Sequence, residues 1–148
     1  LNHTHYPLVE FDFEAEEFEI TNQLERLLDA GYTPVLAHPE RYRCVNRNLG
    51  AVYQWYRMGV VIQINKGSVL GGFGRRVQRT ADAILRHRLA AVAASDAHSC
   101  EIRTPDLSRL QEVLDWEYGD GCSWLLLEEN PSRILQDREV LWDNPIPF

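Results

Sequence analysis

Short apolar runs alternate along this chain with longer segments whose apolar residues recur at helical spacing. The apolar runs predict four strands, at residues 7–13, 33–37, 60–65 and 89–94. Helical spacing predicts helices at residues 14–30, 48–58, 75–88 and 105–118, and a last helical region that begins at residues 124–127. A helix follows each strand, so the pattern indicates one α/β domain over residues 1–148 with a parallel sheet that is buried on both faces.

The segments between these elements leave two questions open. Residues 66–74, KGSVLGGFG, are rich in glycine and could cradle a phosphate through backbone N–H groups, or could be a flexible connection to the next helix. They fit neither the P-loop nor the dinucleotide-binding pattern. Asn130 and Pro131 predict a helix N-cap and first turn, and residues 142–148, with two prolines, predict an irregular tail.

Composition excludes several classes of protein. The net charge of −7 argues against a nucleic-acid binder, which needs a basic face. No apolar run approaches the roughly 20 residues of a membrane-spanning helix. The cysteines are odd in number and widely spaced, at Cys44, Cys100 and Cys122, which favours reduced thiols in a cytoplasmic protein over a disulfide framework.

Polar side chains with metal-binding chemistry follow the predicted strands. His38, Asn65 and the pair Asp96 and His98 come directly after the second, third and fourth strands, and Glu10 lies on the first. The carboxyl ends of parallel strands share one rim, where sites of such folds lie. A single buried histidine is more often packed than a ligand, and an aspartate there can simply cap a helix. The set together predicts a site for Zn, Mn or Fe.

Two arginines accompany these residues, Arg41 after the second strand and Arg103 after the fourth. An arginine is most often a solvated surface charge. Beside two strand ends that carry metal-type ligands, the better interpretation is capture of a phosphate group, because guanidinium binds phosphate through paired hydrogen bonds.

A histidine pair lies at the start of the sequence. His3 and His5 would point to one face of an extended segment and could bind a metal there. We favour a polar lead-in to the first strand, because the chemistry downstream does not need this pair.

Other mechanisms of hydrolysis do not fit the sequence. A cysteine phosphatase needs an arginine six positions after its cysteine, but Gly50 follows Cys44 and Asp106 follows Cys100 at that distance. A G-x-S-x-G serine motif and a C-x-x-C zinc motif do not occur.

Three stretches together resemble a known family. Residues 36–42 (LAHPERY), 67–74 (GSVLGGFG) and 94–98 (ASDAH) are similar to the PHP-type metal-dependent protein-tyrosine phosphatases of bacterial capsule and exopolysaccharide clusters, the CpsB/CapC type. Residues 129–131 (ENP) are similar too, and the resemblance runs from about residue 7 to residue 135.

The resemblance implies a distorted, TIM-like (β/α)7 barrel that holds a cluster of divalent metal ions, often manganese. It implies metal ligands at Glu10, His38, Asp96 and His98, and phosphate-binding catalytic arginines at Arg41 and Arg103. The implied substrate is the phosphotyrosine tail of a bacterial tyrosine autokinase, hydrolysed with metal ions and arginines stabilising the developing charge.

The chain also departs from this family. The family's opening H-x-H strand and further early ligands have no counterpart here, and Lys66 stands where a small or polar residue is expected. Four strands cannot close a barrel that takes about eight. We therefore expect the chain to correspond to the C-terminal part of such an enzyme. We also expect its open first strand to pair with a second copy or to belong to a longer protein.

Two alternatives to a protein-tyrosine phosphatase remain. One is a small-molecule phosphoesterase of the same superfamily, such as a histidinol-phosphate type enzyme. The other is a catalytically incomplete chain that keeps the fold and acts as a binding or assembly piece.

Overall fold

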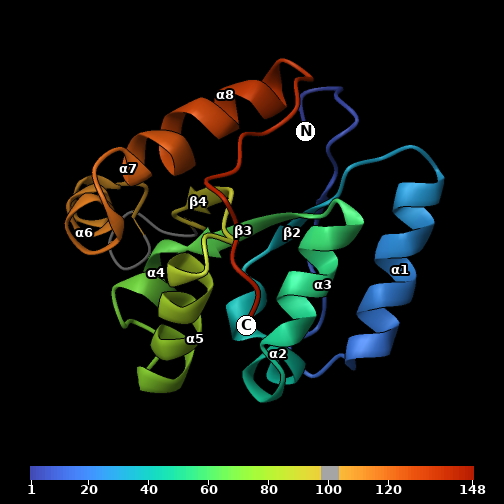
Figure 1. The fold of residues 1–148 in the computed structure, drawn as a ribbon, viewed down its shortest axis with the longest axis horizontal. Helices are drawn as coiled ribbons and strands as arrows, with labels where there is room; N and C mark the ends of the chain where they lie inside the picture. The colour runs from blue at the N-terminus through green and yellow to red at the C-terminus, as the bar shows by residue number, and fades with distance from the viewer. Residues whose placement is uncertain (98–103) are drawn as a thin grey trace.

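The computed structural model describes residues 1–97 and 104–148 (Figure 1). The first half contains β1 (Leu8–Val9), α1 (Glu17–Asp29), β2 (Val35–Ala37), η1 (Pro39–Arg41), α2 (Arg43–Arg47), α3 (Gly50–Met58) and β3 (Val61–Asn65). The second half contains α4 (Lys66–Val69), α5 (Arg75–Arg86), β4 (Val92–Ala94), α6 (Ser108–Tyr118), α7 (Cys122–Trp124), η2 (Leu125–Glu129) and α8 (Asn130–Leu135).

The four strands form one parallel sheet in the order β1-β2-β3-β4. Val35 of β2 pairs with Val61 of β3, and Ile64 of β3 pairs with Ala93 of β4. Because sequential strands are neighbours and run the same way, their carboxyl ends meet at one rim. The α/β class, the parallel sheet and the rim predicted from the sequence are confirmed.

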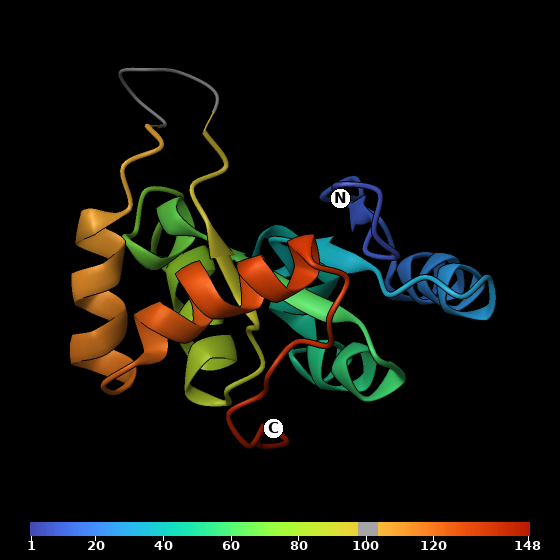
Figure 2. The same cartoon turned by 90° about the horizontal axis from the view of Figure 1, so that it is seen from above.

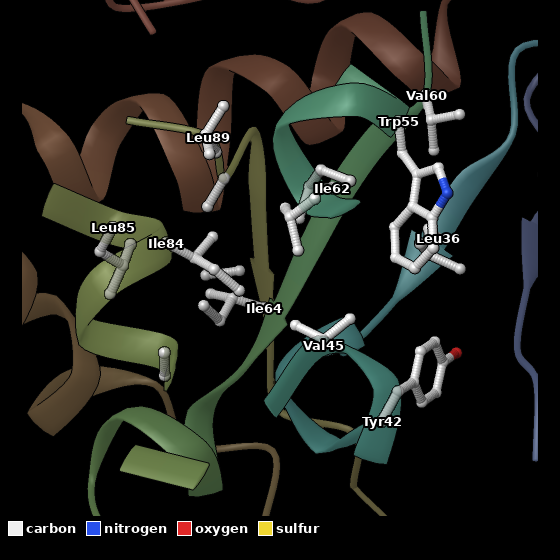
Figure 3. Packing of buried hydrophobic residues seen from close by; sticks show 14 of the residues in the cluster. Leu36, Tyr42, Val45, Trp55, Val60, Ile62, Ile64, Ile84, Leu85 and Leu89 are labelled. Atoms are coloured by element: carbon white, nitrogen blue, oxygen red, sulfur yellow. The ribbon is translucent and has the colours of Figure 1, made fainter. Parts of the chain in front are cut away.

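Both faces of the sheet are buried, as the apolar runs predict. The larger core joins Leu36, Ile62 and Ile64 to apolar residues of α1, α3, α5 and α6, and Figure 3 shows part of this packing. The other face joins Val35 and Val61 to Ile134 of α8. In Figure 1, α8 lies on the opposite side of the sheet from α3 and α5, and Figure 2 shows α1 and α6 at opposite ends of the molecule.

The first strand is much shorter than the predicted residues 7–13. Only Leu8 and Val9 pair with β2. Asp12 then turns the chain, because its side chain accepts a hydrogen bond from the Glu14 N–H at 2.8 Å and its carbonyl accepts one from Ala15. The alternation of apolar and acidic residues thus continues past the end of β1, and residues 10–13 lie beyond the paired part of the strand.

The last helical region begins at Cys122 and runs without a break through α7, η2 and α8. Asn130 has helical backbone angles in mid-run, so the predicted N-cap is wrong. Its buried side chain instead donates to the carbonyl oxygens of Ala91 and Leu141 and accepts from the Leu141 N–H. Asn130 therefore ties the start of β4 to the tail, whose irregular conformation is confirmed.

The terminal histidines do not lie on an extended segment. His3 has a φ of 61° and lies in a turn, so the geometry in which both rings share a face is absent. His5 instead contacts Asp137 through its ring and its backbone N–H, at 2.5 and 2.8 Å. The favoured interpretation, a polar lead-in, agrees with this arrangement.

Two further expectations can be compared with the structure. Cys44 and Cys122 are free thiols, and Cys100 lies outside the described residues. Across residues 1–97 and 104–148, no helix combines the length and the apolar character that crossing a membrane requires.

Candidate metal and phosphate site

The rim of the sheet brings four of the predicted site residues together. Nε2 of His38, after β2, lies 3.2 Å from Oε1 of Glu10, after β1. Arg41 Nη1 lies 3.7 Å from Oδ2 of Asp96, after β4. Charged and metal-type side chains from three strand ends therefore share one edge, as the sequence predicts.

His38 is held in an unusual backbone conformation. Its φ and ψ are 35° and 54°, in the left-handed region that non-glycine residues rarely occupy, and only 3% of the residue is exposed. Burial, and secondarily the nearby Arg41, lowers the pKa of the imidazole, while Glu10 and Asp96 act in the opposite direction. The lowered pKa favours the neutral ring, which is the form that binds metals.

Asn65 fixes Asp96 from the neighbouring strand. Its side-chain nitrogen donates to Asp96 Oδ2 at 2.9 Å, and its side-chain oxygen accepts from the Gly67 N–H at 2.7 Å. Asp96 itself has a φ of 48°, a second non-glycine left-handed residue on the rim. Hydrogen bonds that orient a ligand in this way are a regular feature of metal sites.

Glu40 is fully buried beneath the rim. Its Oε1 accepts the Asn65 backbone N–H at 2.9 Å, whereas its Oε2 and the Ser68 hydroxyl each lack a partner in hydrogen-bond geometry among the described residues. Burial raises the pKa of this carboxyl to about 7, and the nearby Ser68 hydroxyl opposes the rise. Glu40 links β2 to β3, while Glu10 is the carboxylate that faces His38.

Arg41 lies over two aromatic rings. Its guanidinium carbon lies 4.3 Å from the ring centroid of Phe13 and 4.3 Å from that of Phe73. Such contacts are attractive because a ring face carries negative charge density. The sequence reasoning did not find either phenylalanine. The signal for Phe73 was its place as the single aromatic residue in the glycine-rich stretch.

The donor types on this rim fit a divalent ion. An imidazole nitrogen and a carboxylate oxygen face each other in the His38–Glu10 pair, and both are ligands that Zn, Mn and Fe accept. In the described part of the chain, no three histidine, cysteine, aspartate or glutamate side chains lie close enough to hold a metal. His98 and Arg103 lie outside the described residues, so the full ligand set stays a prediction.

A separate cavity of about 580 Å³ lies on another part of the molecule, where residues that precede β4 meet the end of α6 and the tail. Its lining includes Arg88, Tyr118, Trp124 and Trp142, and none of the predicted site residues. The cavity and the predicted site on the rim therefore share no residue.

Comparison with known proteins matches the resemblance seen in the sequence. The family described as "Capsular polysaccharide synthesis, CpsB/CapC" matches residues 1–136. Tyrosine-protein phosphatase YwqE of Bacillus subtilis is 32% identical over 99% of this chain and 58% of its own length. Tyrosine-protein phosphatase CpsB of Streptococcus pneumoniae is 31% identical over 95% of this chain and 60% of its own length.

Solved structures agree with the sequence match. This chain superposes with a TM-score of 0.90, at 31% identity, on a chain from the crystal structures of YwqE from Bacillus subtilis and CpsB from Streptococcus pneumoniae. Those proteins are described as metal-dependent tyrosine phosphatases. The superposition covers all of this chain and 60% of that chain, so the chain spans about 60% of its relatives' length. The fold, the family match and the sequence identity agree, and the chain belongs to the CpsB/CapC family of capsular polysaccharide synthesis proteins.

Proposed function

We propose that this chain carries a metal-dependent protein-tyrosine phosphatase site of the CpsB/CapC type. The observation that carries the proposal is the placement of Arg41 beside Asp96, on the same rim as the His38–Glu10 pair. A cation that can bind phosphate thus lies next to side chains that can bind a divalent metal. The names of the relatives, which are tyrosine-protein phosphatases, support the same activity.

Each residue has a defined part in this proposal. Glu10, His38, Asp96 and His98 hold the metal ions, with manganese as the expected ion. When bound, the ions would stabilise the charge on the phosphoryl group and would make the attacking water easier to deprotonate. Arg41 and Arg103 bind the phosphate and stabilise the charge that develops on it. Asn65 keeps Asp96 oriented through its 2.9 Å hydrogen bond.

The proposed setting follows from the family. The substrate would be the phosphotyrosine of a bacterial tyrosine autokinase, and its hydrolysis would regulate capsule or exopolysaccharide synthesis. We also propose that the four strands are part of a larger PHP-type (β/α)7 barrel. The consecutive strand order and the shared rim support this arrangement. Pairing of two copies through the open edge of β1, and a cytoplasmic location, stay predictions.

Hydrolysis assays with a matched pair of variants test the proposal. The protein is loaded with Mn²⁺, and hydrolysis of para-nitrophenyl phosphate and of a phosphotyrosine peptide is measured together with metal content. Arg41→Ala is expected to lower kcat/KM about 100-fold or more, a loss typical of removing one charge-stabilising group, while metal content stays the same. Arg47→Ala removes an exposed arginine of α2 and is the control.

The outcomes also separate the alternatives. Equal loss of metal and activity in Arg41→Ala would show that Arg41 serves the metal site and not the phosphate. Turnover of histidinol phosphate in preference to the phosphopeptide would favour a small-molecule phosphoesterase. A protein that neither retains metal nor hydrolyses any of these esters would contradict the enzyme and favour a binding or assembly role.

A further inference from the structure

The guanidinium of Arg41 lies over the rings of two phenylalanines that the family match and the ligand pattern leave without a role. We propose that Phe13 and Phe73 form an aromatic clamp that positions Arg41 to receive the phosphate. The inference rests on the proposed function, since it takes Arg41 as a phosphate-binding residue. Phe13 and Phe73 are positioning residues in this account, because they act through Arg41.

The geometry of the clamp leaves the arginine free to bind an anion. Each ring centroid lies 4.3 Å from the guanidinium carbon, so the two rings together restrict where the group can lie. All five N–H donors of a guanidinium lie in its plane and none points from its faces. Asp96 is near one of these donors, at 3.7 Å. The two phenylalanine rings therefore attract the charged arginine without placing an oxygen or nitrogen acceptor against the donors that a phosphate needs.

The glycine-rich stretch makes room for one half of the clamp. A Cβ atom at Gly67 would lie 2.7 Å from Cε2 and 2.9 Å from Cζ of Phe73, distances that real Cβ atoms do not show. Gly72 donates its N–H to the Gly67 carbonyl at 2.7 Å, which folds the stretch back on α4. The phenylalanine ring thus lies directly against the backbone at Gly67. From the sequence, residues 66–74 could cradle a phosphate or form a flexible connection. The structure shows a different role, in which Gly67 allows an aromatic ring to pack against the backbone.

The other half comes from the segment that continues past the short first strand. Phe13 follows the turn at Asp12, and its ring centroid is 6.0 Å from that of His38 and 6.3 Å from that of Tyr42. The Tyr42 hydroxyl donates to the Ala37 carbonyl and accepts the Phe11 N–H, so this segment is fastened to the end of β2. The clamp therefore joins two loops, one from each side of the strand end that carries His38 and Arg41.

The test combines a structural readout with a binding readout. Phe73→Leu removes the ring face but keeps apolar volume, Phe73→Tyr keeps the ring, and Phe18→Leu makes the same change at an exposed site on α1. The first readout is the NMR signal of the Arg41 Nε–H, assigned by its loss in Arg41→Lys, because stacked rings shift it upfield. The second is the dissociation constant for inorganic phosphate, measured by calorimetry on protein loaded with Mn²⁺, with metal content determined in parallel.

We expect Phe73→Leu to move the Arg41 signal downfield and to weaken phosphate binding roughly threefold to thirtyfold, the range expected for a lost cation–π contact. Phe73→Tyr and Phe18→Leu should keep both properties, and metal content should not change. Gly67→Ala, which displaces the ring of Phe73, should resemble Phe73→Leu.

Several results would overturn the inference while leaving the proposed function intact. One is wild-type phosphate affinity in Phe73→Leu, and another is failure of Phe73→Tyr to restore it. If the unmodified protein does not bind phosphate, the proposed function is contradicted, and with it the proposal that the clamp positions Arg41 for phosphate. An Arg41 signal without an upfield shift would contradict the stacking itself.

Discussion

Asn65 donates a hydrogen bond from its side-chain amide to Oδ2 of Asp96, across a distance of 2.9 Å. The same side chain accepts the Gly67 N–H, and the Asn65 backbone N–H binds Glu40. One buried residue at the end of β3 thus connects the ends of β2 and β4 and the start of α4. Its position makes the orientation of Asp96 dependent on a neighbour that is not itself a proposed ligand.

Removal of this hydrogen bond should weaken metal binding. We expect Asn65→Ala to lower the affinity for Mn²⁺ about 10- to 100-fold, the usual cost of losing a residue that orients a ligand. A competition assay with a chelating dye measures the affinity. Asn22→Ala, on the exposed face of α1, is the control. Unchanged affinity in Asn65→Ala would show that Asp96 is oriented without Asn65 or does not bind metal.

Asn130 should be a major contributor to stability. Its side chain makes hydrogen bonds of 2.7 to 2.9 Å with Ala91 and both backbone groups of Leu141, in a fully buried position. Asn130→Ala leaves these backbone groups without a partner, and we expect it to lower the free energy of unfolding by about 2–4 kcal/mol. Urea unfolding measures the change.

Asn22→Ala is a matched control here as well, because both asparagines lie in helices and gain the same helix propensity from alanine. The control should change the free energy of unfolding by less than about 0.5 kcal/mol. A loss in Asn130→Ala that does not exceed the control would mean that the tail is not held by this side chain.

Asp115 should contribute a stabilising interaction that depends on pH. The backbone N–H and the hydroxyl of Ser123 donate to its carboxylate at 2.9 and 2.7 Å, and these bonds lower the pKa of Asp115. A pKa below that of the unfolded chain means that the stabilisation is complete above about pH 4 and is lost as the pH falls through the folded-state value.

The replacement Asp115→Asn tests this dependence because it removes the charge and keeps the shape. The variant should unfold at a lower urea concentration than the unmodified protein at pH 7, and the difference should shrink as the pH approaches 3. Asp120→Asn, at an exposed position, is the control. A difference that stays constant between pH 7 and pH 3 would contradict the lowered pKa.

Lys66, the single lysine of the chain, should hold the segment before α6 in place. Its ammonium group donates to the carbonyl oxygens of Thr104 and Asp106 at 2.5 and 3.0 Å. Lys66→Met keeps the apolar stem and removes these bonds, so we expect a loss of about 1–2 kcal/mol in the free energy of unfolding. Hydrogen exchange at residues 104–110 should also become faster. Unchanged exchange there would show that α6 is positioned without Lys66.

The sequence predicts much of the fold because burial leaves a periodic signal. The short runs that contain Leu36, Ile62 and Ala93 are typical of strands buried on both faces, and the helices between them indicate a parallel sheet. Parallel strands share a rim, so the placement of His38 and Asp96 at one edge also follows from the sequence, whereas Glu10 comes to this edge because β1 ends at Val9. The length of β1 does not follow from the sequence, because the turn at Asp12 depends on one local hydrogen bond and leaves the alternating pattern unchanged.

The contacts that sequence reasoning missed are between residues far apart in the chain. Phe13 and Phe73 are 60 positions apart and meet on Arg41 only because a glycine at position 67 leaves space for a ring. Asn130 is followed by a proline, a pattern typical of a helix N-cap. In the structure its side chain instead forms hydrogen bonds with Ala91 and Leu141, which are distant in the sequence. Local signals do not report which distant group a polar or aromatic side chain will contact.

The left-handed backbone at His38 and Asp96 lowers the stability of the fold at two residues that the proposed activity needs. A non-glycine residue in this conformation costs on the order of 1 kcal/mol, and His38 also buries a ring nitrogen, Nδ1, that has no hydrogen-bond partner within residues 1–97 and 104–148. Glycine at position 96 would relieve the backbone cost and remove a proposed ligand. Selection for heat resistance alone is therefore expected to favour replacements at this rim, so any such selection has to be coupled to a screen for phosphatase activity.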